Sequence, residues 1–167
     1  MLEHDPEIKV LFVDDSLERW KAFQDVTSKS YGQSKPVVRL YWAMDARSAR
    51  LLLKAHQFHM IMLDHDLSED PASRVETGLD VARWIKEEKI PTFKIITHSL
   101  NPAGRVNIYH ELNQAMYCVQ QYPWAWKQNP SVLYTQLERR LPPADIVDNT
   151  CEEDGDEGLN CDSDVCS

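Results

Sequence analysis

The stretch Met60-Ile61-Met62-Leu63-Asp64-His65-Asp66-Leu67 decides the expected fold of this chain. Its four leading apolar residues do not alternate with polar ones, and such a short continuous run predicts a strand that is buried on both faces. Strands of this kind belong to parallel sheets that helices cover on both sides. Ligands of open α/β sheets bind beyond the carboxyl ends of the strands. Asp64, His65 and Asp66 therefore stand where a binding site is expected.

Three more strands are predicted, with helical segments between them. Residues 8–13 form an apolar run that ends on Asp14 and Asp15. The runs 37–42 and 93–97 are rich in β-branched and aromatic residues, as strands are. Helices are expected after residue 16 and over residues 45–57, 77–90 and 102–121. This alternation predicts an α/β fold whose parallel sheet is built from right-handed crossovers.

Charge divides the chain into two parts near residue 142. Residues 1–142 contain all 18 Lys and Arg residues and 18 of the 27 acids, so this part is neutral. The other nine acids lie in residues 143–167, which contain no basic residue and few large apolar ones. We therefore expect one α/β domain at 1–142 and a disordered acidic C-terminal tail at 143–167.

Composition also excludes several classes of partner. A neutral domain lacks the basic excess of duplex nucleic-acid binders, so no duplex nucleic-acid partner is expected. No apolar segment approaches the roughly 18 residues that a membrane helix needs, and residues 1–7 do not resemble the basic start of a signal peptide. We expect a cytoplasmic protein with no membrane partner, and the sequence leaves its oligomeric state open.

Polar side chains follow three of the four predicted strands. Carboxylates that crowd one edge of a sheet raise one another's pKa values unless a cation neutralises them. Oxygen ligands suit Mg²⁺ or Mn²⁺, and two histidines also admit a softer transition metal. The sequence therefore predicts a divalent-metal site at this edge. Its candidate residues are Asp14 and Asp15 after the first strand, Asp64, His65 and Asp66 after the third, and His98, Ser99 and Asn101 after the fourth.

Each of these residues also has an ordinary structural explanation. An aspartate at a strand end often caps the next helix, and a single His65 or His98 is more often a hydrogen-bonded loop residue than a catalyst. Ser99 and Asn101 are common before a helix that begins with proline. Arg105 could point its guanidinium at a phosphate or form a surface salt bridge, and the sequence favours neither of these two roles. The convergence of so many groups on one edge favours a functional site.

The motifs at these strand ends resemble those of a known family. An acidic pair after the first strand and an aspartate after the third resemble the response-regulator receiver fold, a flavodoxin-like three-layer sandwich with a mostly parallel sheet. The closer resemblance is to the cyclic-phosphate-processing receiver family, an offshoot of that fold. It covers residues 8–120 and rests on Leu11-Phe12-Val13-Asp14-Asp15 with Arg19 and Phe23, on Leu63-Asp64-His65-Asp66-Leu67, on Gly78 and Asp80, and on His98-Ser99-Leu100-Asn101-Pro102 with Gly104.

This resemblance implies the processing of a cyclic phosphate on a nucleotide, a cyclic oligonucleotide signal or an RNA end. The leading interpretation is a metal-dependent phosphodiesterase, in which the ion activates water and a histidine protonates the leaving oxygen. By position, the resemblance implies Asp14, Asp15, Asp64 and Asp66 as metal ligands or their supports, His65 and His98 as acid–base groups or ligands, and Asn101 with Ser99 as phosphate-binding residues. We also count Asp64 among the catalytic groups and Arg105 among the substrate-binding residues.

Two other functions stay open. The same pocket could bind a cyclic nucleotide without cleaving it, as a sensor or sponge. The domain could instead be a divergent receiver that is phosphorylated on Asp64. Ordinary receivers carry a lysine before a proline after their fifth strand, and this chain has no counterpart, because Lys35 is far too early and Lys127 precedes Gln128. His65 beside the acceptor position also suits hydrolysis better than storage of a phosphoryl group.

Overall fold

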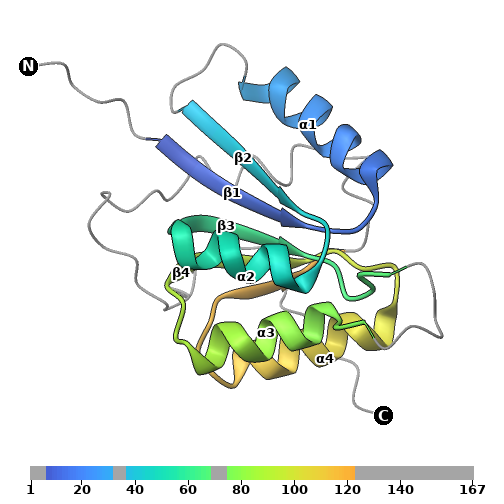
Figure 1. Cartoon of the computed structure of the whole chain (residues 1–167), viewed down its shortest axis with the longest axis vertical. Coiled ribbons are helices and arrows are strands. Elements are labelled where there is room, and N and C mark those ends of the chain that lie inside the picture. The colour runs from blue at the N-terminus through green and yellow to red at the C-terminus, as the bar shows by residue number, and fades with distance from the viewer. Residues whose placement is uncertain (1–6, 32–36, 69–74, 123–167) are drawn as a thin grey trace, which may run out of the picture.

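A computed structural model describes residues 7–31, 37–68 and 75–122, without the side chains of 29–31. Five parallel strands form one sheet in the order β2-β1-β3-β4-β5 (Figure 1). The predicted alternation of strands and helices is confirmed, and a fifth strand is added to it. The elements are β1 (Glu7–Val13), α1 (Leu17–Tyr31), β2 (Val37–Ala43), α2 (Ala46–Ala55), β3 (Phe58–Leu63), α3 (Gly78–Glu87), β4 (Thr92–Thr97), α4 (Pro102–Asn113) and β5 (Val119–Gln121).

Helices cover both faces of the sheet and give the molecule three layers. Alternate residues of β1 and β3 point to opposite faces, so Phe12 and Met62 pack with Phe23 of α1. Leu11 and Ile61 belong to the core on the other face, with residues of α2, α3 and α4. Figure 1 shows α1 on one side of the sheet and α2, α3 and α4 on the other. This burial on both faces explains the unbroken apolar runs and confirms the flavodoxin-like sandwich.

Backbone hydrogen bonds continue one residue past the ends of three strands. The amide of Asp14 donates to the carbonyl of Ala43 over 3.0 Å, and the amide of Asp64 donates to that of Val13 over 2.9 Å. The amide of His98 donates to Leu63 over 3.1 Å. Asp14, Asp64 and His98 are therefore held side by side, as strand residues are, although they come from three separate segments of the chain.

Local sequence signals fix where the helices begin. The Asp45 carboxylate accepts a hydrogen bond from the Ser48 amide over 2.7 Å and caps α2. The Thr77 amide donates to the Asp80 carboxylate over 2.8 Å, as in a capping box, and starts α3. Both starts agree with the sequence-based expectation.

Gly78 lets α3 begin directly against the end of β3. Its amide donates to the carbonyl of His65 over 2.7 Å. A Cβ atom at this position would lie only 1.8 Å from the carbonyl oxygen of Asp64. Only glycine permits this close approach, and the approach holds the backbone that carries Asp64 and His65.

The prediction for the last helix was wrong at its C-terminal end. We expected a helix over 102–121, but α4 ends at Asn113, and Val119 begins β5. The backbone turns at Met116, whose φ of 64° is left-handed and cannot continue a helix. The side chain of Met116 is exposed, whereas Tyr117 is buried. No glycine marks this turn in the sequence, and β5 forms because it pairs with β4.

Other expectations lie outside the described residues. These are the domain boundary at 142 and the disordered acidic tail at 143–167. Among the helices of the described residues, none is long and apolar enough to cross a membrane.

Candidate functional site at the carboxyl edge of the sheet

Three buried side chains form the inner group of the site. Asp14, Asp64 and His98 follow the ends of β1, β3 and β4, and each is at most 1% exposed. One potential ligand atom from each lies within 4.8 Å of the other two. The His98 Nε2 atom lies 3.0 Å from Asp14 Oδ2, and because a carboxylate only accepts, Nε2 carries the proton in this contact. These three predicted residues are thus brought together.

Arg19 of α1 supplies the positive charge that the inner group needs. Its Nε donates to Asp14 Oδ1 over 3.0 Å, and its Nη2 donates to Asp64 Oδ2 over 2.8 Å. Burial lowers the pKa of Arg19, but the carboxylates of Asp14 and Asp64 more than offset this, and the net pKa lies above its ordinary value. The guanidinium is therefore a permanent charge between the two carboxylates.

Asp15 lies at the rim of the inner group. Its Oδ1 accepts a longer hydrogen bond of 3.3 Å from Arg19 Nη2, and its side chain is 17% exposed where that of Asp14 is fully buried. Desolvation by burial, followed by the charge of Asp14, raises the pKa of Asp15 above its ordinary value, although Arg19 opposes this. The pair Asp14–Asp15 is therefore unequal: one carboxylate is central and the other peripheral.

The inner group fits a divalent cation by its donor chemistry. It offers two carboxylates and one imidazole, a mixed oxygen and nitrogen set that suits Mn²⁺ or a softer transition ion better than Mg²⁺. Every carboxylate oxygen of Asp14 and Asp64 already accepts a hydrogen bond from the protein. An ion that binds here must therefore replace some of these contacts.

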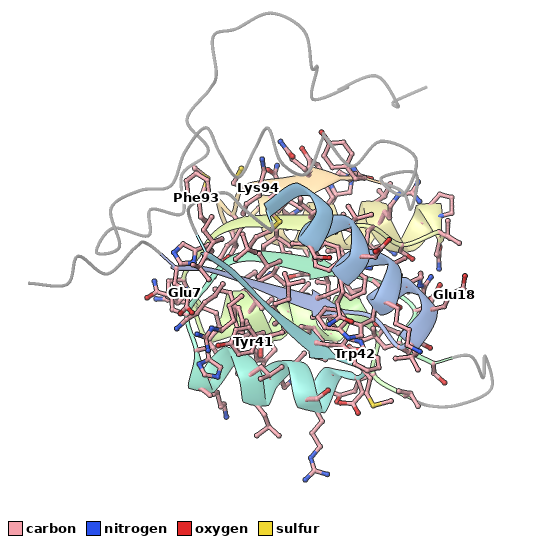
Figure 2. All side chains as sticks on the ribbon, turned by 90° about the horizontal axis from the view of Figure 1, so that it is seen from above. Glu7, Glu18, Tyr41, Trp42, Phe93 and Lys94 are labelled. Carbon is pink, nitrogen blue, oxygen red and sulfur yellow. The ribbon has the colours of Figure 1, made fainter. Side chains whose placement is uncertain are left out.

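Aromatic rings hold the inner group from the α1 side of the sheet. The ring of Phe12 stacks on the imidazole of His98 with centroids 4.8 Å apart. The Trp42 indole donates from Nε1 to the carbonyl of Asp14 over 2.7 Å and stacks on Trp20. Figure 2 shows Trp42 at the end of the sheet where α1 begins, near Glu18, and Glu7 at the opposite end. These rings restrict the positions of His98 and of the Asp14 backbone.

A second group, separate from the inner group, consists of His65, Asp66 and Asn101. His65 Nδ1 lies 2.7 Å from Asp66 Oδ1, and Asn101 Nδ2 donates to the same oxygen over 3.4 Å. Asp66 is about half exposed and, within the described residues, it does not belong to the three-residue group that could hold a metal. Its position is that of a partner of His65.

Ser99 and Arg105 fix the loop that leads into α4. Ser99 is buried, and its hydroxyl accepts from the Asn101 amide over 3.1 Å. The Arg105 Nη1 atom donates to the Ser99 carbonyl over 2.5 Å. The Asn101 side chain caps α4 by accepting from the Gly104 amide over 2.9 Å. Of the three predicted substrate-binding residues, Asn101 contacts Asp66, and all three form hydrogen bonds that hold this loop.

Sequence reasoning did not count Arg19 or Trp42 among the site residues. Arg19 was only part of the family pattern, yet it contacts three of the four predicted metal-binding carboxylates. Its place in the first turn after Asp14 was a usable signal, because that turn begins at the same edge of the sheet. For Trp42, nothing in the sequence shows that its indole reaches the Asp14 carbonyl.

Comparisons with solved structures support the fold. The Mn²⁺-bound form of response regulator Rcp1 is 21% identical, with a TM-score of 0.58 over 82% of this chain and 99% of that one. Chemotaxis protein CheY4 of Vibrio cholerae is 19% identical, with a TM-score of 0.55 over 81% of this chain and 100% of that one. The receiver domain of NtrX from Brucella abortus is 21% identical, with a TM-score of 0.52 over 78% of this chain and 99% of that one. At these identities the likeness shows the fold alone.

A family model adds what the fold does not show. No curated protein matches the chain significantly. The model of the cyclic-phosphate processing receiver domain matches residues 9–114, which run from within β1 to the end of α4 and include all of the site residues described above. This chain therefore belongs to the cyclic-phosphate processing receiver domain family.

Proposed function

We propose that this chain is a metal-dependent phosphodiesterase that opens a cyclic phosphate by hydrolysis. The substrate class is a cyclic nucleotide, a cyclic oligonucleotide signal or an RNA end that carries a cyclic phosphate. Water adds its oxygen to phosphorus, one ring P–O bond breaks, and a proton passes to the leaving oxygen. The observation that carries the proposal is the inner group, whose buried ligand atoms lie within 4.8 Å of one another next to a histidine–carboxylate pair.

In this proposal Asp14, Asp64 and His98 hold the divalent ion, Mg²⁺ or Mn²⁺, with a transition metal as a further candidate. A bound ion supplies Lewis acidity, which neutralises phosphoryl charge and makes water a better nucleophile. His98 is fully buried against Phe12, so its part is to bind the ion or to hold Asp14. Asp15 and Asp66 support this centre from its rim.

His65 is the residue best placed to move a proton. The Asp66 carboxylate can only accept a hydrogen bond, so His65 Nδ1 carries the proton and donates the hydrogen bond to Asp66. Nε2 is then the basic nitrogen of His65, and the contact fixes the orientation of the ring. The same arrangement of carboxylate and imidazole serves general acid–base catalysis in other enzymes. His65 is partly exposed and adjoins Asp64, whose Oδ1 accepts from the His65 amide over 2.8 Å. In this proposal the substrate reaches from the inner group to the His65 imidazole.

The start of α4 is the proposed phosphate-binding side. Asn101, Ser99 and Arg105 lie there, and backbone amides at a helix N-terminus favour an anion. Arg105 can hold a phosphoryl oxygen only with guanidinium N–H groups other than the one on the Ser99 carbonyl. A cytoplasmic location belongs to the same proposal, because nucleotides and RNA are found there.

The test is incubation with a panel of 2′,3′-cyclic, 3′,5′-cyclic and cyclic dinucleotide phosphates in the presence of Mn²⁺ or Mg²⁺. Ring-opened product that disappears in Asp64→Asn and His65→Gln would support the proposal. Asp25→Asn and His110→Gln are matched controls, because both residues are exposed on helices. Retention of intact ligand without product would instead favour the sensor or sponge function.

A divergent receiver is the second candidate function. Asp64 follows β3, and Thr97, at the end of β4, has a buried hydroxyl with no hydrogen-bond partner among the described residues. Against it, Arg19 covers the Asp64 carboxylate, and no lysine precedes a proline after β5 in the sequence, because Lys127 is followed by Gln128. Treatment with acetyl phosphate tests this function: a phosphoryl group on Asp64 would support it, and a chain that takes up none would not.

A further inference from the structure

Arg19 contacts the same carboxylate oxygens that a metal ion would use. Its Nη2 lies 2.9 Å from Asp14 Oδ1 and 2.8 Å from Asp64 Oδ2. Divalent ions of the Mg²⁺ type sit about 2.0–2.1 Å from oxygen ligands. The guanidinium and the ion therefore cannot both occupy the space between these two oxygens.

Charge does not force Arg19 out of the site altogether. Asp14, Asp15 and Asp64 bring three negative charges, and Arg19 brings one positive charge, so a divalent ion completes neutrality with Arg19 still present. What the guanidinium needs is another anionic partner that the ion does not use. Asp15 is such a partner: it already contacts Nη2, at 3.3 Å, and lies outside the three-residue group.

We propose that Arg19 is a built-in counter-ion that a divalent metal displaces from Asp14 and Asp64 onto Asp15 at the rim. This inference rests on the metal dependence of the proposed function and assigns different roles to the two adjacent acids. Asp14 is a ligand. Asp15 is the residue that receives Arg19, not a ligand. Arg19 thus neutralises the buried carboxylates while no ion is bound and sets how tightly an ion binds.

The length of the Asp15 contact agrees with this assignment. Arg19 Nη2 lies 3.3 Å from Asp15 Oδ1 but 2.8 Å from Asp64 Oδ2. Release from Asp64 would let the guanidinium approach Asp15 more closely, and charge-assisted hydrogen bonds strengthen as they shorten. Asp15 is therefore a partner whose ion pair with Arg19 can become stronger.

Electron paramagnetic resonance of Mn²⁺ measures the exchange without any need for turnover. Arg19→Gln removes the competing cation and should tighten Mn²⁺ binding at least about tenfold, or ~1.4 kcal/mol. Arg39→Gln is the matched control, since Arg39 pairs with Glu7 in β1, at the other end of the sheet, and should bind like the wild type. Unchanged or weaker binding by Arg19→Gln would overturn the proposal.

A double-mutant cycle separates the two roles of Asp15. If Asp15 receives Arg19, Asp15→Asn weakens Mn²⁺ binding in the wild type but not in the Arg19→Gln background. If Asp15 is a ligand, it weakens binding equally in both, and the proposal fails. Mn²⁺ binding by Arg19→Gln alone, with none by the wild type, would support the exchange and count against metal-dependent activity. Binding by neither protein would overturn both.

Arg19→Lys keeps the experiment decisive if the glutamine variant does not fold. Its ammonium retains the charge but lacks the planar fork that reaches several carboxylates at once. We expect a Mn²⁺ affinity above that of the wild type. An affinity equal to that of the wild type or lower would overturn the proposal.

Discussion

Gly104 of α4 lies directly against the imidazole of His65, so closely that a Cβ atom on the glycine would sit 2.3 Å from His65 Cγ. The helix that Asn101 caps and that carries Arg105 is therefore in contact with the proposed proton-transfer residue. The backbone of α4 thus determines where the His65 ring can stand.

Gly104→Ala should displace the His65 ring and impair both stability and activity. The added methyl group cannot coexist with the ring in its present position, and overpacking of this kind costs about 1–3 kcal/mol. Thermal unfolding and the hydrolysis rate of the best cyclic phosphate measure the two effects. In a His65→Ala background the loss of stability should largely vanish, and an equal loss there would contradict the contact.

Asp66→Asn should lower kcat while KM changes little. The carboxylate orients His65 through its Nδ1, and partners that orient a catalytic group are worth roughly 10–100-fold in activity. Steady-state kinetics across a range of pH would check this, with Asp25→Asn as the control. Wild-type kcat in Asp66→Asn would show that this pair does not serve the reaction.

Trp42→Phe should destabilise the protein by about 1 kcal/mol, because the Asp14 carbonyl loses its 2.7 Å hydrogen bond from the indole. The phenyl ring still packs near Trp20, so the effect is largely that of the missing N–H group. Urea unfolding measures it. Trp84→Phe, on α3, provides a comparison that should leave Mn²⁺ binding unchanged, whereas Trp42→Phe should weaken it through Asp14.

Asp15→Asn should raise the unfolding temperature near neutral pH but not in acid. The folded-state pKa of Asp15 is raised above 3.8, so the fold favours the protonated form. Any stability due to that protonation is present below the unfolded pKa and is lost as pH rises through the folded pKa. Melting curves at several pH values, without divalent ions, test this. A variant that is less stable than the wild type at neutral pH would contradict it.

The sheet and its edge could be predicted because the signals are local. Apolar runs such as 60–63 define strands buried on both faces, and parallel strands bring their polar ends together. The end of α4 could not be predicted in this way, because Met116 takes a left-handed conformation without any glycine to signal it. That turn depends on the pairing of β5 with β4.

The division of the site into two groups was only partly accessible from the sequence. Asp64 and His65 are neighbours in the chain, yet Asp64 lies with Asp14 and His98, and His65 contacts Asp66. The depth of His98 could not be predicted, since its burial depends on the ring of Phe12 in another strand. The reach of Arg19 to Asp64, 45 residues away in the chain, likewise follows only from the packing of β1 beside β3.

The most direct test is phosphorus NMR of a cyclic phosphate that has been incubated with the protein and Mn²⁺ in oxygen-labelled water. EDTA removes the ion after the incubation and before the spectrum is recorded. The ring phosphodiester signal should be replaced by a monoester signal, with one labelled oxygen on phosphorus, and Asp64→Asn should leave the ring intact. An unchanged ring signal for every substrate of the panel, from a wild-type protein shown to bind Mn²⁺, would contradict the proposed hydrolysis.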